Sequence, residues 1–125
     1  MNNNKIIIDL DDTICSTKNG DYENSIPKEK VIKKIKEYKN LGFEIIIYTS
    51  RNMRTYKGNV DLIEANTLPI IIKWLKKFDV PYDQIIVGKP WPSFGGFYVD
   101  DKAIRPDEFV NLTYSEIQKI TNANN

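Results

Sequence analysis

Short apolar runs alternate along this chain with longer segments whose apolar residues recur at helical spacing. The runs occupy residues 5–10 (KIIIDL), 43–48 (FEIIIY), 84–87 (QIIV) and 97–99 (FYV). The helical segments occupy residues 28–41 and 68–78, and the capping-box sequence TYSE at 113–116 opens a last short helix. Strands that alternate with helices predict an α/β fold, here one Rossmann-like domain over residues 1–125 with a mainly parallel sheet flanked by helices.

Polar residues lie at or just beyond the end of each of the four predicted strands. They are Asp9, Asp11 and Asp12 after the first, Thr49 after the second, Lys89 after the third, and Asp100 and Asp101 after the fourth. In an open parallel sheet, ligands bind beyond the carboxyl ends of the strands. We therefore expect these side chains to converge on one edge of the sheet.

This set of side chains suits phosphoryl transfer. Several carboxylates in one cleft repel each other unless a cation lies among them, and oxygen ligands favour Mg²⁺. One carboxylate can then attack phosphorus, and a second, two residues on, can act as general acid and base. Thr49 and Lys89 would hold the phosphoryl oxygens, where negative charge spreads in the transition state.

Composition excludes other chemistries. The 125 residues include no His and one Cys, which removes His-based catalysis, an internal disulfide and a structural zinc site. With 18 basic and 17 acidic residues the net charge is +1, which argues against a dedicated nucleic-acid or membrane-surface partner. No apolar run approaches the ~20 residues of a membrane span. We expect a cytoplasmic protein with a small phosphorylated substrate, and a homo-oligomer stays open.

The segment DLDDT at residues 9–13 matches the DxDxT signature of the haloacid dehalogenase superfamily. Thr49 in IIIYTS, Lys89 in VGKP and the Asp pair in FYVDD resemble its three other motifs, in the expected order. The resemblance implies a phosphatase with Asp9 as nucleophile and Asp11 as general acid and base. It also implies Mg²⁺ bound by Asp9, the backbone carbonyl of Asp11 and one of the final pair. We favour Asp101 as the direct ligand with Asp100 assisting, and the choice between the two stays open.

Longer phrases, among them GDYENSIP, TSRNMRTYKGNV and FYVDDKAIRPDEF, are similar to the capsule-biosynthesis phosphatase branch of this superfamily. The resemblance implies a phosphorylated sugar, or a conjugate of one, destined for bacterial capsular polysaccharide. The spacing of the motifs leaves no room for a cap domain, so we expect an open site. Its substrate contacts are assigned to Ser50, Arg51 and Asn52. For Arg51 and Asn52, a role as solvated loop residues fits the sequence equally well.

Two other functions fit parts of the pattern. A receiver-like signalling domain also uses an acidic pair, a hydroxyl and a Lys, but its phosphorylated Asp ends the third strand, whereas here Asp9 ends the first. A polynucleotide end phosphatase suits an open site, and the balanced charge disfavours it.

Three further expectations concern single residues and the long polar stretch. Trp74 is assigned to the core, Cys15 is read as a small buried residue, and residues 121–125 (TNANN) as a frayed tail. Residues 51–66 are expected to form a functional loop.

Overall fold

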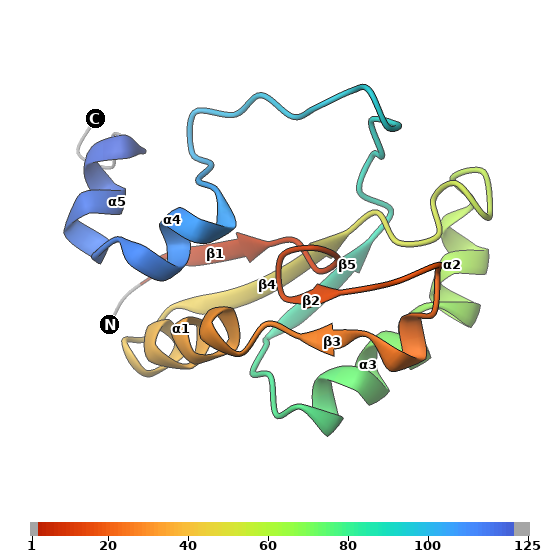
Figure 1. Ribbon diagram of the computed structural model, residues 1–125, viewed down its shortest axis with the longest axis horizontal. Coiled ribbons are helices and arrows are strands. Elements are labelled where there is room, and N and C mark those ends of the chain that lie inside the picture. Colours follow the sequence, from red (N-terminus) through yellow and green to blue (C-terminus); the bar gives the residue numbers. More distant parts are fainter. Residues whose placement is uncertain (1–2, 122–125) are drawn as a thin grey trace. The chain divides into compact units, whose positions relative to one another are not determined.

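The computed structural model describes residues 3–121. The chain forms two compact units, Met1–Trp91 and Pro92–Asn125 (Figure 1). The first unit contains three longer strands, a short hairpin, a 3-10 turn and three helices. In chain order these are β1 Lys5–Ile8, β2 Cys15–Ser16, η1 Tyr22–Asn24, β3 Ile26–Pro27, α1 Glu29–Asn40, β4 Glu44–Thr49, α2 Val60–Asn66, α3 Leu68–Lys77 and β5 Gln84–Val87.

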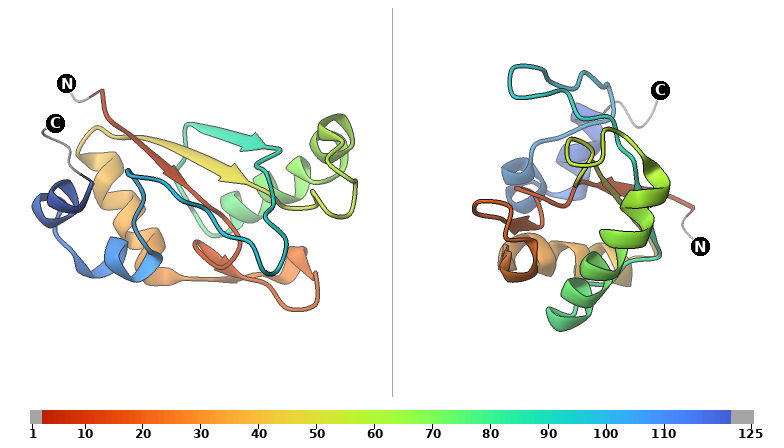
Figure 2. Two further views of the ribbon diagram at one scale, coloured as in Figure 1. Left: turned by 90° about the horizontal axis from the view of Figure 1, so that it is seen from above. Right: turned by 90° about the vertical axis from the view of Figure 1, so that its right-hand side faces the viewer.

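The sheet of the first unit is parallel and has the strand order β1-β4-β5 (Figure 2, left). Ile8 pairs with Ile47 on β4, and Thr49 at the end of β4 pairs with Val87 on β5. Runs of β-branched residues favour such parallel strands. The central strand β4 is mostly buried, whereas the outer strands β1 and β5 are partly exposed. The predicted α/β fold with a parallel sheet and flanking helices is therefore confirmed.

Both crossover connections step in the same direction across the sheet, from β1 to β4 and from β4 to β5. Since such crossovers are right-handed, they place α1 and α3 on the same face. Helix α1 buries Val31, Ile32, Ile35 and Tyr38. It ends before Gly42, whose φ of 96° is a left-handed conformation that stops helices at low steric cost.

The core of the first unit lies between these helices and the sheet. Ile45 and Ile47 of β4 are fully buried, as are Ile71 and Leu75 of α3. Trp74, predicted as a core residue, is buried, and its indole N–H donates to the carbonyl of Ser25 at 2.8 Å. This bond ties α3 to the segment between β2 and β3, which carries part of the site.

The second unit contains α4 Pro106–Asn111 and α5 Tyr114–Ile120. The predicted capping box is confirmed, because the Thr113 hydroxyl accepts from the Glu116 N–H at 3.2 Å and the Glu116 carboxylate accepts from the Thr113 N–H at 3.0 Å. Helix α4 begins in a similar way, with the Arg105 N–H donating to Glu108 at 2.8 Å.

The prediction of a fourth strand at residues 97–99 is wrong for this structure. These residues are not paired with any strand, and Phe97 and Val99 are 79% and 88% exposed. A strand of three residues depends on ladder hydrogen bonds from a neighbour, and Gly95 and Gly96 before it add backbone freedom. Apolar, β-branched composition alone does not supply that neighbour.

One other difference concerns a helix. Helix α2 lies inside the expected loop 51–66, where Asn59 caps it by accepting the Leu62 N–H at 3.2 Å. Within the described residues no cap domain is inserted between the strands, and no helix is long and apolar enough to cross a membrane. Of the expected frayed tail, residues 122–125 lie outside the described part of the chain.

Candidate functional site

A tight turn follows β1 and presents the first acidic residues. The buried Leu10 anchors it, and the Leu10 carbonyl accepts the N–H groups of Thr13, Ile14 and Cys15 at 3.2, 2.8 and 3.2 Å. Asp12 adopts a left-handed φ of 61°, which Asp tolerates better than most residues. Its carbonyl accepts from the Lys28 ammonium at 3.0 Å, so the Asp12 backbone serves the turn itself.

Asp9 lies immediately beyond β1 with a part-exposed carboxylate. The Thr13 hydroxyl donates to its Oδ2 at 3.2 Å, and the Lys89 ammonium lies 3.8 Å from its Oδ1. Burial raises the pKa of Asp9 above its ordinary value, and the nearby Lys89 charge and the backbone N–H of Leu10 oppose that effect. A partly desolvated carboxylate beside one cation is well suited to act as a nucleophile.

Lys89 reaches Asp9 from two strands away. The chain turns at Gly88, whose φ is 86° and where an added Cβ would lie 3.0 Å from the Val60 side chain. The Lys89 N–H then donates to the Thr49 carbonyl at 3.1 Å, which continues the ladder between β4 and β5 by one bond. The register of the sheet thereby sets the position of Lys89.

Thr49 ends β4 and is buried. Its hydroxyl oxygen accepts from the Arg51 backbone N–H at 3.1 Å, a local turn that fixes the chain as it leaves the strand. The structure therefore brings Asp9, Thr49 and Lys89 to the carboxyl ends of three adjacent strands.

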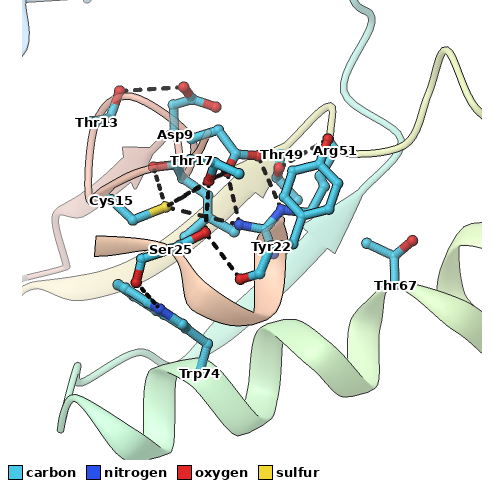
Figure 3. Close-up of polar contacts among 12 residues, drawn as sticks. Asp9, Thr13, Cys15, Thr17, Tyr22, Ser25, Thr49, Arg51, Thr67 and Trp74 are labelled. Atoms are coloured by element: carbon cyan, nitrogen blue, oxygen red, sulfur yellow. Dashed lines mark hydrogen bonds and ion pairs between the residues drawn. The ribbon is translucent and has the colours of Figure 1, made fainter. Parts of the chain in front are cut away.

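Several donors hold Asp11, among them Arg51 and Thr17, both of which are labelled in Figure 3. Arg51 binds it through two atoms, with Nε 3.0 Å from Oδ2 and Nη2 2.8 Å from Oδ1. The Thr17 hydroxyl also donates to Oδ1, at 3.1 Å. The Tyr22 ring covers the guanidinium at 4.3 Å, and the side chain of Arg51 is only 1% exposed.

The residues predicted to contact substrate differ in their surroundings. Ser50 is part-exposed at the end of β4 and its carbonyl accepts the Met53 N–H at 3.0 Å. Asn52 has a left-handed φ of 63° and accepts from the Thr67 hydroxyl at 2.7 Å, so its amide secures the loop to the start of α3. Arg51 is occupied by Asp11 and buried. The substrate-binding role of these three residues stays a prediction.

Asp100 and Asp101 belong to the second unit and are exposed there. The Asp100 carboxylate accepts from the Lys102 N–H at 2.8 Å, which forms a local turn. Among residues 3–121, His, Cys, Asp and Glu side chains do not gather in a group of three or more that could hold a metal ion. The assignment of either Asp as a metal ligand therefore stays a prediction.

The chemistry of the donors still fits a hard cation. The chain has no His, and its single thiol, Cys15, is buried with its pKa raised by burial to about 11, so the turn after β1 presents no exposed soft ligand. What the turn offers are the oxygens of Asp9 and Asp11. Such ligands suit Mg²⁺, whose charge would offset the burial that raises the pKa of Asp9.

Sequence reasoning missed the partners of Asp11. Nothing in the spacing of Thr17 and Tyr22 indicated that the hairpin β2–β3 would return them to the turn after β1. Arg51 carried one usable signal, because it follows Thr49 by two residues and so leaves the sheet at the same edge. Thr13 was part of the recognised motif, and its bond to Asp9 gives that position a physical reason.

Residues 6–81, more than half of the chain, match the family of haloacid dehalogenase-like hydrolases. A Vibrio cholerae protein of known crystal structure is 50% identical over 98% of this chain and 99% of that chain, with a TM-score of 0.93. A chain of the Pnkp1/Rnl/Hen1 complex is 18% identical over 88% of this chain and 35% of that chain, with a TM-score of 0.52, which shows a shared fold alone. No curated protein sequence matches the chain.

The family match over residues 6–81 covers the turn after β1 and the whole of β4, and the Vibrio cholerae protein extends the likeness across nearly all of the remainder. This chain belongs to the haloacid dehalogenase-like hydrolases.

Proposed function

We propose that the protein is a magnesium-dependent phosphatase that hydrolyses phosphate monoesters through an aspartyl-phosphate on Asp9. One observation carries the proposal: the Lys89 ammonium lies 3.8 Å from the Asp9 carboxylate, so a nucleophile and a phosphate-neutralising cation meet at the sheet edge. Asp11 follows two residues on in the same turn, and its side chain is partly exposed. Membership of the hydrolase family supports this reading.

The reaction has two steps. A carboxylate oxygen of Asp9 bonds to phosphorus while the bond between phosphorus and the ester oxygen breaks, and Asp11 donates a proton to the departing alcohol. Asp11 then removes a proton from water, whose oxygen attacks phosphorus and releases inorganic phosphate and free Asp9. Lys89 and Thr49 face the phosphoryl oxygens during both steps and stabilise their charge. Bound at Asp9 and the Asp11 carbonyl, Mg²⁺ would supply neutralisation of the phosphoryl charge.

The substrate we propose is small: a phosphorylated sugar, or a conjugate of one, that serves as a precursor of bacterial capsular polysaccharide. Two observations support it. The motif phrases are similar to those of capsule-biosynthesis phosphatases, and within the described residues no cap domain restricts the site. An open site accepts the end of a larger conjugate as readily as a free sugar phosphate.

Phosphate release from a panel of sugar phosphates, amino-alcohol phosphates, nucleotides and 3′- or 5′-phosphorylated oligonucleotides tests the proposal. Each compound is assayed with Mg²⁺ and with a chelator, and Asp9→Asn is the matched control because it is nearly isosteric. We expect magnesium-dependent release from the sugar phosphates and none from the variant. Preference for the oligonucleotides would replace the substrate class with polynucleotide ends, and no release from any compound would refute the phosphatase.

A further inference from the structure

The side chain of Arg51 is buried, which is rare for arginine. Its side chain is 1% exposed, and its guanidinium is bound on one edge by both oxygens of Asp11. The guanidinium therefore faces Asp11 and not the solvent from which a substrate arrives. Arg51 is better placed to act on a substrate through Asp11 than by direct contact.

The surroundings of the guanidinium fix it in one orientation. The Tyr22 ring lies over its face at 4.3 Å, and its Nη2 lies 3.8 Å from the Cys15 sulfur. The backbone of Tyr22 is itself held by the hairpin, because the Ser25 N–H and hydroxyl both donate hydrogen bonds to the Tyr22 carbonyl, at 3.3 and 3.0 Å. Because Arg51 binds both oxygens of Asp11, the fixed guanidinium also restrains the Asp11 carboxylate; we call this two-atom contact the grip of Arg51 on Asp11.

The grip is not an arrangement that stability alone would favour. The Nη1 atom of Arg51 is buried without a hydrogen-bond partner, and an unsatisfied buried donor is a cost to the fold. Buried ion pairs are also weak contributors to stability compared with apolar packing. A buried Arg with an orphaned donor, aimed at a residue of the candidate site, indicates a functional constraint.

We infer that Arg51 is a positioning residue that fixes the Asp11 carboxylate for proton transfer during ester cleavage. The inference rests on the proposed function, in which Asp11 is the general acid and base. It differs from a substrate-clamp role because Arg51 would affect the rate of proton transfer and leave substrate affinity unchanged.

Leaving-group dependence separates the two roles. An alkyl phosphate needs protonation of its departing oxygen, whereas p-nitrophenyl phosphate releases a weakly basic phenolate that needs little. In Arg51→Met, kcat/KM should fall at least tenfold more for the alkyl phosphate than for p-nitrophenyl phosphate, with KM nearly unchanged. Arg54→Met, which removes an exposed arginine from the same loop, should change both substrates by the same factor.

A double-mutant cycle tests whether Arg51 acts through Asp11. In the Asp11→Asn background, Arg51→Met should lower kcat/KM for the alkyl phosphate less than threefold, because the group that it positions is already gone. Equal losses on both substrates, a loss confined to KM, or full additivity in the cycle would overturn the inference. Where Arg51→Met does not fold, Arg51→Lys serves instead, since it keeps the charge and loses the two-pronged contact.

These outcomes are distinguishable from failure of the proposed function. If the wild-type protein hydrolyses neither ester, the phosphatase itself is refuted. If Asp11→Asn shows the leaving-group dependence and the Arg51 variants do not, the phosphatase stands and only the positioning role is lost.

Discussion

The ammonium of Lys89, just beyond β5, lies 3.8 Å from the carboxylate of Asp9, just beyond β1, although β4 separates the two strands. The contact joins the ends of the sheet's two outer strands. It also spans 80 residues of sequence, so it forms only when all three strands are in register.

Asp9→Asn should abolish phosphate release and raise the stability of the metal-free protein at neutral pH. Burial raises the folded-state pKa of Asp9, so its favourable contribution is present below its ordinary pKa of 3.8 and is lost as the pH rises through the folded-state value. Above that pH range the buried, ionised carboxylate of Asp9 destabilises the folded state. The neutral amide of Asn in Asp9→Asn removes this destabilisation. Thermal unfolding in chelator at pH 7 and pH 4 measures this, and the gain from Asn should shrink at the lower pH.

Lys89→Met should lower kcat by about 10² to 10³, the usual cost of removing one electrostatic contact to the transition state. The substitution keeps the length of the side chain, and the Lys89 N–H remains free to donate to Thr49, so the fold should persist. Steady-state kinetics on the preferred ester measure the loss. Lys89→Arg is the control that keeps the positive charge, and it should retain more of the rate than Lys89→Met. If Lys89→Met is as active as the wild-type protein, Lys89 has no part in the mechanism.

Cys15 should be inert in the folded protein. Burial raises the pKa of its thiol to about 11 from an ordinary 9.0, and Asp11 adds to that rise. At pH 8 this lowers the thiolate fraction about 100-fold, and thiolate is the reactive form. Reaction with a coloured disulfide reagent should therefore be at least that much slower in the native state than in urea. Rapid native-state labelling would contradict the buried assignment.

Asp83 links the start of β4 to α1, since its carboxylate accepts the Ile45 N–H at 2.8 Å and pairs with Lys39. The Lys39 contact, aided by the Ile45 N–H, lowers the pKa of Asp83. Its contribution is therefore present above the ordinary pKa of 3.8 and is lost as the pH falls through the lower folded-state value. Asp83→Asn should cost about 0.5–1 kcal/mol at pH 7. Urea unfolding at pH 7 and pH 3 should show that cost and its decline at the lower pH.

The strands and main helices were predictable because their signals are local. Runs such as KIII and EIIIYT are β-branched, although only EIIIYT is largely buried, and the apolar spacing of α1 and α3 fits one covered face. Helix α2 gave a weaker signal, since Ile63 is its one buried residue and its start depends on the Asn59 cap. The segment at 97–99 was misassigned because its composition resembles a strand while pairing depends on distant backbone.

The candidate site was predictable only as a set of strand ends. Parallel topology brings Asp9, Thr49 and Lys89 together whatever the loops do. The grip of Arg51 on Asp11 was not predictable, because it depends on how the hairpin folds back and on which side chain fills the interior there. Spacing places an arginine near the edge, and packing decides whether it faces solvent or the core.

The pairing of Thr49 with Val87 has a consequence for how such a chain can vary. Because successive strand residues point to opposite faces, deleting one residue between Gln84 and Gly88 would turn the following lysine away from Asp9. The apolar content of β5 would barely change. Related proteins should therefore tolerate many apolar substitutions within β5 but few insertions or deletions. The length of this strand should be conserved more strictly than the identity of its residues.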